Sequence, residues 1–137
     1  MFMSKTLSQM LKNPDLLVSA ALVGDSWVEK ASNGKSFDVL NPSTGEVITS
    51  LPDLGVEEAR KAIDAAEIAQ KDWAQKTGKE RSAVLRKFND LMVANADDLG
   101  AILTAEMGKP LAEAKGEIMY GASFIEWFAE EAKRVYG

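Results

Sequence analysis

The C-terminal part of the sequence carries a helical pattern that restricts the folds open to this chain. It begins at Pro110, which the first turn of a helix tolerates, and runs about 27 residues to Tyr136, or about 40 Å. Its apolar groups cover most of the helix circumference: Ile118, Tyr120, Gly121, Phe124, Ile125, Trp127 and Phe128. A compact chain of 137 residues has a radius of gyration of about 14 Å. Such a helix would extend beyond a self-contained globule, so we expect further protein to cover it.

Three more helices are predicted between residues 55 and 108. In the first, residues 56–75, apolar side chains form one stripe that we expect to be buried: Val56, Ala59, Ile63, Ala66, Ala69 and Trp73. Residues 77–80 (TGKE) fit a capping box that opens the second helix. Its expected buried residues are Val84, Leu85, Phe88, Leu91 and Met92. The third is predicted to open at Asn95 as its N-terminal cap and to end at Gly108.

Short segments precede these helices. Residues 21–53 alternate between extended runs and turn-forming stretches at 32–34 and 41–45, which predicts two small β-hairpins. Residues 1–20 form a lead-in with a short helix predicted over 4–12, stopped by Asn13 and Pro14. The expected segment is mostly α: two hairpins over 21–53, then about four helices over 55–136.

Composition excludes several classes of function. The net charge is −5, with both signs interleaved along the helices, so no basic face is available to bind nucleic acid. The longest apolar run, residues 16–23, spans about eight residues, far fewer than the roughly 20 needed to cross a bilayer. The first 22 residues lack the pattern of a signal peptide. We therefore expect a soluble cytoplasmic protein with no membrane partner.

The residue types that perform much enzyme chemistry are absent. The sequence holds no cysteine and no histidine, which removes thiol nucleophiles, imidazole bases and the usual zinc ligands. It has no glycine-rich phosphate-binding motif. Glutamate pairs on the last helix are more typical of a hydrated surface, and Lys109 of a charge at a helix C-terminus. No catalytic, cofactor-binding or metal-ligating residue is predicted.

One aromatic group leaves two interpretations open. Tyr120 and Phe124 are one helical turn apart and could line an apolar channel for a ligand. The alternative is that these rings, with Trp127 and Phe128, pack against further protein.

Three stretches together resemble the aldehyde dehydrogenase superfamily. They are residues 40–47 (LNPSTGEV), 106–114 (EMGKPLAEA) and 124–131 (FIEWFAEE). The third is most similar to bacterial succinate-semialdehyde dehydrogenases and to relatives such as glutarate-semialdehyde dehydrogenase. The resemblance runs from about residue 21 to the last residue.

The resemblance implies an α/β parent fold in which residues 21–137 form the N-terminal part of the cofactor-binding domain. It implies oxidation of succinate semialdehyde, or a close aldehyde acid, with NAD or NADP. The family's cysteine nucleophile, its glutamate base and its cofactor-binding motifs all fall beyond Gly137. The chain alone is therefore expected to be inactive, to bind no cofactor, and to associate with the rest of the enzyme chain or with other copies of itself. Tyr120, and more weakly Phe124, occupy places where relatives put side chains that line the aldehyde channel.

A different class of protein remains as the alternative. Residues 111–135 could form the exposed apolar face of a free-standing helical module for interaction or oligomerisation, without catalysis.

Overall fold

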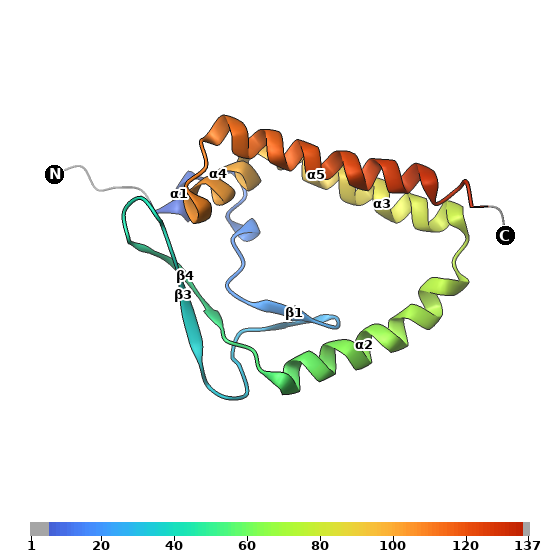
Figure 1. Ribbon diagram of the computed structural model, residues 1–137, viewed down its shortest axis with the longest axis horizontal. Helices are drawn as coiled ribbons and strands as arrows, with labels where there is room; N and C mark the ends of the chain where they lie inside the picture. The colour runs from blue at the N-terminus through green and yellow to red at the C-terminus, as the bar shows by residue number, and fades with distance from the viewer. Residues whose placement is uncertain (1–5, 136–137) are drawn as a thin grey trace.

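A computed structural model of the protein describes residues 6–135. Within these described residues, five α-helices, one 3₁₀ turn and two antiparallel hairpins follow one another in the order shown in Figure 1. The hairpin strands are β1 (Ala21–Val23), β2 (Ser26–Val28), β3 (Ser36–Leu40) and β4 (Val47–Pro52). The helices are α1 (Leu7–Met10), α2 (Val56–Gln75), α3 (Gly78–Ala94), α4 (Ala96–Met107) and α5 (Leu111–Glu131), and η1 (Pro14–Leu16) is the 3₁₀ turn. The predicted arrangement of two hairpins followed by four helices is confirmed.

Helix α5 packs on α3 and α4 through small side chains. Ala114, Ala122 and Ala129 are spaced seven or eight residues apart, so they share one face of α5, and all three are buried. Because alanine has only a methyl group, the backbones approach closely, and α3 and α5 lie side by side in Figure 1. Asn89 of α3 adds a hydrogen bond from its Nδ2 to the carbonyl oxygen of Ala122, at 2.8 Å.

The predicted helix boundaries hold at two junctions. At the start of α3, Thr77 Oγ1 accepts from the backbone N–H of Glu80, and Glu80 Oε2 accepts from that of Thr77, at 2.7 Å, which is a capping box. Gly108 ends α4 with φ +80°, a left-handed conformation that suits glycine. At Asn95 the boundary is right, but the capping interaction is different. Its side-chain Nδ2 donates to Leu91 O of α3, at 2.8 Å, so it serves the end of one helix instead of the start of the next.

The two hairpins are separate two-stranded sheets. Strands β1 and β2 pair with Ala21 opposite Val28, and Gly24 provides φ +64° in their two-residue turn. Strands β3 and β4 pair from Ser36 opposite Pro52, with an irregularity at Val39 and Leu40. Neither hairpin lies between two layers of helix in the part of the chain that the structure describes.

The lead-in and the last helix are shorter than their patterns predict. Helix α1 ends at Met10, because Leu11 has extended backbone angles, and residues 4 and 5 of the predicted helix lie outside the described range. Helix α5 ends at Glu131 and is followed by a turn, so the predicted 27-residue helix has 21 residues. Tyr136, its predicted end, lies outside the described residues.

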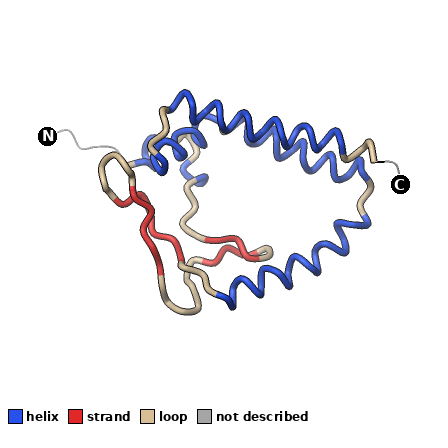
Figure 2. The backbone as a smooth tube through the Cα atoms, viewed as in Figure 1, coloured by secondary structure: helices blue, strands red, loops and turns tan. Residues whose placement is uncertain are grey.

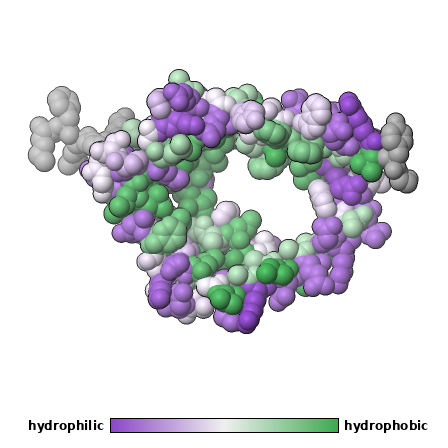
Figure 3. Space-filling view, viewed as in Figure 1, coloured by the Kyte–Doolittle hydropathy of each residue, from purple (hydrophilic) through white to green (hydrophobic). Residues whose placement is uncertain are grey.

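The elements enclose a central opening instead of a common core. Figure 2 shows the backbone as a ring, and the space-filling view in Figure 3 shows an opening bordered in part by apolar residues. No large side chain among the described residues is fully buried. None of their helices is long and apolar enough to cross a membrane.

The predicted apolar stripe of α2 is not buried within this chain. Ile63 is 68% exposed, Val56 is also exposed, and only Trp73 is partly covered among the large side chains of the stripe. On α3 the same holds for Val84, Phe88 and Leu91, whereas Leu85 and Met92 are half-buried. The reason is geometric: α2 packs mainly on β1, and α3 uses its other face against α5.

Candidate functional site

The candidate site is the face of α5 opposite its alanine face. The turn from Gly108 to Pro110 sets the direction of the helix, and a Cβ at Gly108 would lie 3.1 Å from Pro42 Cγ. The junction is therefore closely packed against the β3–β4 turn. With one face of α5 held by α3 and α4, the aromatic side chains are directed away from both helices.

Tyr120 and Phe124 form an edge-to-face pair on this exposed face. Their ring centroids are 4.8 Å apart with an interplanar angle of 80°. Tyr120 is 64% exposed and Phe124 is 47% exposed. The predicted one-turn spacing thus brings the two rings into contact, while leaving most of the Tyr120 ring accessible.

An open depression of about 590 Å³ lies beside the C-terminal half of α5. Its lining residues are Ser123, Phe124, Glu126, Trp127, Phe128, Glu130, Glu131 and Arg134. Phe124 belongs to this lining and Tyr120 does not. The structure therefore brings Phe124, Trp127 and Phe128 to one depression, with Tyr120 at its N-terminal side along the helix.

Ion pairs fix the charged border of the depression. Glu130 pairs with Arg86 of α3 and with Lys133, whose Nζ lies 2.9 Å from Glu130 Oε2. Glu131 pairs with Arg134 at 3.3 Å. Both carboxylates already have cationic partners, so they do not form a free acid/base couple. Of these pairs only Glu130–Arg86 connects α5 to α3.

The depression does not fit a nicotinamide dinucleotide. A pyrophosphate needs N–H donors and positive charge, usually at a helix N-terminus. Here the lining carries three carboxylates, at Glu126, Glu130 and Glu131, and one guanidinium, at Arg134. No group of histidine, cysteine or acidic residues in the range 6–135 could hold a metal ion.

Lys109, a further candidate from the sequence, also has a structural partner. Lys109 forms an ion pair with Glu117 on α5, and its side chain is three-quarters covered. The expectation that Lys109 is a solvated charge at the end of a helix is thus wrong in part, because its ammonium group is paired with Glu117 and its side chain is mostly covered.

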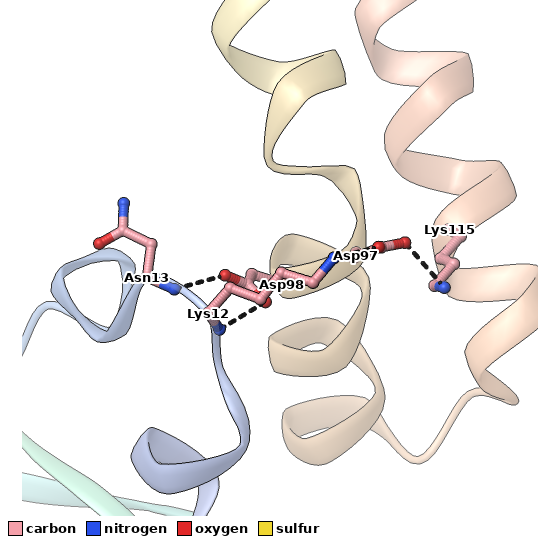
Figure 4. Close-up of polar contacts among 5 residues, drawn as sticks. All are labelled: Lys12, Asn13, Asp97, Asp98 and Lys115. Carbon is pink, nitrogen blue, oxygen red and sulfur yellow. Dashed lines mark hydrogen bonds and ion pairs between the residues drawn. The ribbon is translucent and has the colours of Figure 1, made fainter.

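Two carboxylates that the sequence interpretation did not single out have strongly lowered pKa values. Hydrogen bonds from Ser32 and from the backbone N–H of Gly55, at 3.0 Å, lower the pKa of Glu58 to about 2. Hydrogen bonds from Lys115 and Lys12 lower the pKa of Asp97 to about 2. Figure 4 shows Asp97 with its neighbour Asp98 between the N-terminal segment and α5. The sequence did carry a signal for Glu58, because it stands three residues after the N-cap of α2, which is the glutamate position of a capping box. None existed for Asp97, because both of its partners lie outside its own helix: Lys115 is on α5, and Lys12 is 85 residues away in the sequence.

Comparison with known proteins identifies the family. The model of the aldehyde dehydrogenase family matches residues 27–137. The chain belongs to the aldehyde dehydrogenase family. It is 54% identical over 127 residues to glutarate-semialdehyde dehydrogenase of Pseudomonas putida, covering 93% of this chain and 26% of that protein. It is 50% identical over 127 residues to the NADP(+) succinate-semialdehyde dehydrogenase of Escherichia coli, with the same coverage.

The fold agrees with this assignment. The crystal structure of succinate-semialdehyde dehydrogenase from Burkholderia pseudomallei superposes with a TM-score of 0.90 at 53% identity, covering 93% of this chain and 26% of that one. The resemblance noted in the sequence, and the α/β aldehyde dehydrogenase fold that it implied, are thus confirmed. The chain spans about a quarter of the length of these relatives. The domain boundaries at residues 20 and 21, and the channel role of Tyr120 and Phe124, stay predictions.

Proposed function

We propose that this chain is the N-terminal region of an NAD(P)-dependent aldehyde dehydrogenase that oxidises succinate semialdehyde or a close aldehyde acid. In that enzyme the aromatic face of α5 forms one wall of the aldehyde channel, with Tyr120 and Phe124 as the lining side chains. The proposal rests on one observation. The aromatic pair is exposed on a helix whose other face is packed, within a backbone that superposes on a solved succinate-semialdehyde dehydrogenase at a TM-score of 0.90.

The chemistry sets the limits of what these residues contribute. Oxidation of an aldehyde by this family begins with attack of a thiolate on the carbonyl carbon, and this sequence contains no cysteine. NAD or NADP, when bound, accepts the hydride. Tyr120 and Phe124 would exclude water and orient the carbon chain of the substrate by apolar contact. The 137 residues by themselves are accordingly expected to be inactive, and their partner is the rest of a cytoplasmic enzyme.

The second candidate function is a free-standing helical module for interaction or oligomerisation. Large apolar side chains exposed on both α2 and α3, such as Ile63 and Phe88, favour association with other protein. Sedimentation distinguishes the two proposals. A monomer, or one oligomer of defined size, with one sharp unfolding transition supports a self-sufficient module, while heterogeneous aggregates without such a transition support a missing body.

A chimera tests the leading proposal directly. The 127 aligned residues of this chain replace the matching quarter of the Escherichia coli relative, and NADP-linked oxidation of succinate semialdehyde is followed as absorbance at 340 nm. Activity within about tenfold of the parent enzyme is expected, since half of the aligned residues are identical. A folded chimera without activity would contradict the proposal. The 137-residue chain alone serves as the control, and aldehyde oxidation by it above the buffer rate would refute the expected inactivity.

A further inference from the structure

The N-terminal segment crosses the molecule as a strap, which we define as residues 6–20. It lies between α4 and the β3–β4 hairpin: Leu7, Met10 and Leu17 of the strap share one depression with Ala105 of α4 and with residues 47–48 of β4. Helix α1 within the strap contributes no buried residue. The apolar burial of the strap is limited to Leu11, which is buried, and to the half-buried leucines at positions 7, 16 and 17.

Asp98 holds the strap by its backbone. Its Oδ1 accepts from the N–H of Lys12 at 3.0 Å, and its Oδ2 accepts from the N–H of Asn13 at 2.7 Å (Figure 4). Asp98 as a whole is only 6% exposed. Hydrogen bonds of this kind, from a neutral N–H to a partly buried carboxylate, are about twice as strong as those between neutral groups.

Asp97 joins the strap to both helices. One of its oxygens lies 2.8 Å from Lys12 Nζ and the other 2.8 Å from Lys115 Nζ of α5. The side chains of Asp97 and Lys12 are more than half exposed, so this pairing is weaker than that of Asp98. Asp97 and Asp98 thus both bind the strap at residues 12 and 13. Asp98 binds backbone N–H groups, and Asp97 binds the side chain of Lys12.

A single large apolar side chain is anchored beside this polar contact. Leu11 directly precedes the two bonded N–H groups, and it is 7% exposed. Towards the other end of the strap, Ser19 Oγ contacts Thr49 Oγ1 of β4 at 2.5 Å. The strap therefore connects the helices to the β3–β4 hairpin, and its firm attachment on the helix side is at residues 11–13.

We propose that Asp97 and Asp98 form a clasp that holds the strap closed, and that the strap opens as a unit while α3, α4 and α5 stay packed. Opening needs the loss of the clasp and of the Ser19–Thr49 contact, and the exposure of Leu11 and of the half-buried leucines at positions 7, 16 and 17. Helix α5, by contrast, is held along its whole length by α3 and α4. The open state further exposes Ala105 of α4 and Ile48 of β4, which are half-buried while the strap is closed. In the closed state the strap therefore covers the region where α4 and β4 come together, and in the open state it does not.

Backbone hydrogen exchange of the 137-residue chain tests the proposal. In the unmodified chain, the amides of Lys12 and Asn13 should exchange faster than those of residues 117–129 in α5. In Asp98→Asn, one backbone N–H faces an NH₂ donor, so exchange at residues 12 and 13 should rise about tenfold or more. The α5 amides should keep their rates. Asp97→Asn should have a smaller effect, because it removes exposed ion pairs only.

Asp90→Asn is the matched control, since Asp90 is an exposed carboxylate of α3 outside the clasp, and it should leave both regions unchanged. Equal exchange in the strap and in α5 of the unmodified chain would overturn the proposal without any variant. Unchanged exchange at residues 12 and 13 in Asp98→Asn would overturn it as well. Acceleration of the α5 amides together with the strap in that variant would show a global role for Asp98 and would also refute local opening.

Discussion

Replacing Gly78 by alanine should destabilise the α3–α5 pair, although alanine normally favours a helix. Gly78 is the first residue of α3, and a Cβ there would lie 3.3 Å from the carbonyl carbon of Ala132 and 3.5 Å from Lys133 Cα. The carbonyl oxygen of Ala132 would be closer than van der Waals contact allows. All three are backbone atoms, so no flexible side chain can move aside.

The expected size of the effect follows from two opposing terms. Overpacking against a rigid neighbour costs about 1–3 kcal/mol. The gain in helix propensity from glycine to alanine is at most about 1 kcal/mol and is smaller in the first turn. We therefore expect Gly78→Ala to lower the free energy of unfolding by about 1–2 kcal/mol.

Gly116→Ala provides the matched control. Gly116 lies inside α5, and a Cβ there would meet no atom within 4 Å. Only the propensity term remains, so this variant should raise the free energy of unfolding by up to about 1 kcal/mol. Urea unfolding followed by circular dichroism at 222 nm measures both. Equal shifts of the two midpoints in the same direction would refute the reasoning, since the argument depends on the Ala132 backbone.

Three further predictions concern the packing, the pH dependence and the channel. Asn89→Ala should lower the free energy of unfolding by about 1 kcal/mol in the same urea assay, because Ala122 O loses its side-chain donor; no change would show that water replaces the donor. The pKa of Glu58 is lowered to about 2, so its stabilising effect is complete above its ordinary pKa of 4.5 and is lost as the pH falls towards 2. Urea unfolding at several pH values should therefore show a fall in stability across that range that Glu58→Gln flattens, and parallel profiles would contradict this. In the active chimera, Tyr120→Ala and Phe124→Ala should each lower kcat/KM for the semialdehyde about tenfold or more, mainly through KM, with the KM for NADP unchanged. If only kcat falls, these residues do not line the channel.

Local patterns in the sequence were sufficient for the order of elements and for most boundaries. The capping box at Thr77 and the left-handed Gly108 involve neighbouring residues, so a few consecutive residues are enough to predict them. The contact between Tyr120 and Phe124 follows in the same way from the helical repeat. The periodicity of apolar residues does not show which apolar face of a helix packs against other residues of the chain. Ile63 and Phe88 have the periodicity of buried residues, yet both are exposed in this chain.

Contacts between residues distant in the sequence decided the features that local patterns did not predict. Asp97 and Asp98 look like ordinary acidic residues in the first turn of a helix, and only the return of the strap to α4 gives them Lys12 and Asn13 as partners. The sequence by itself determined the helices, the hairpins and the family, because these depend on local periodicity and on short motifs. The tertiary structure alone decided that α5 packs by its alanines and leaves its aromatic rings exposed. The reason is that the choice between two apolar faces of one helix depends on neighbours distant in the chain, which the helical repeat does not encode.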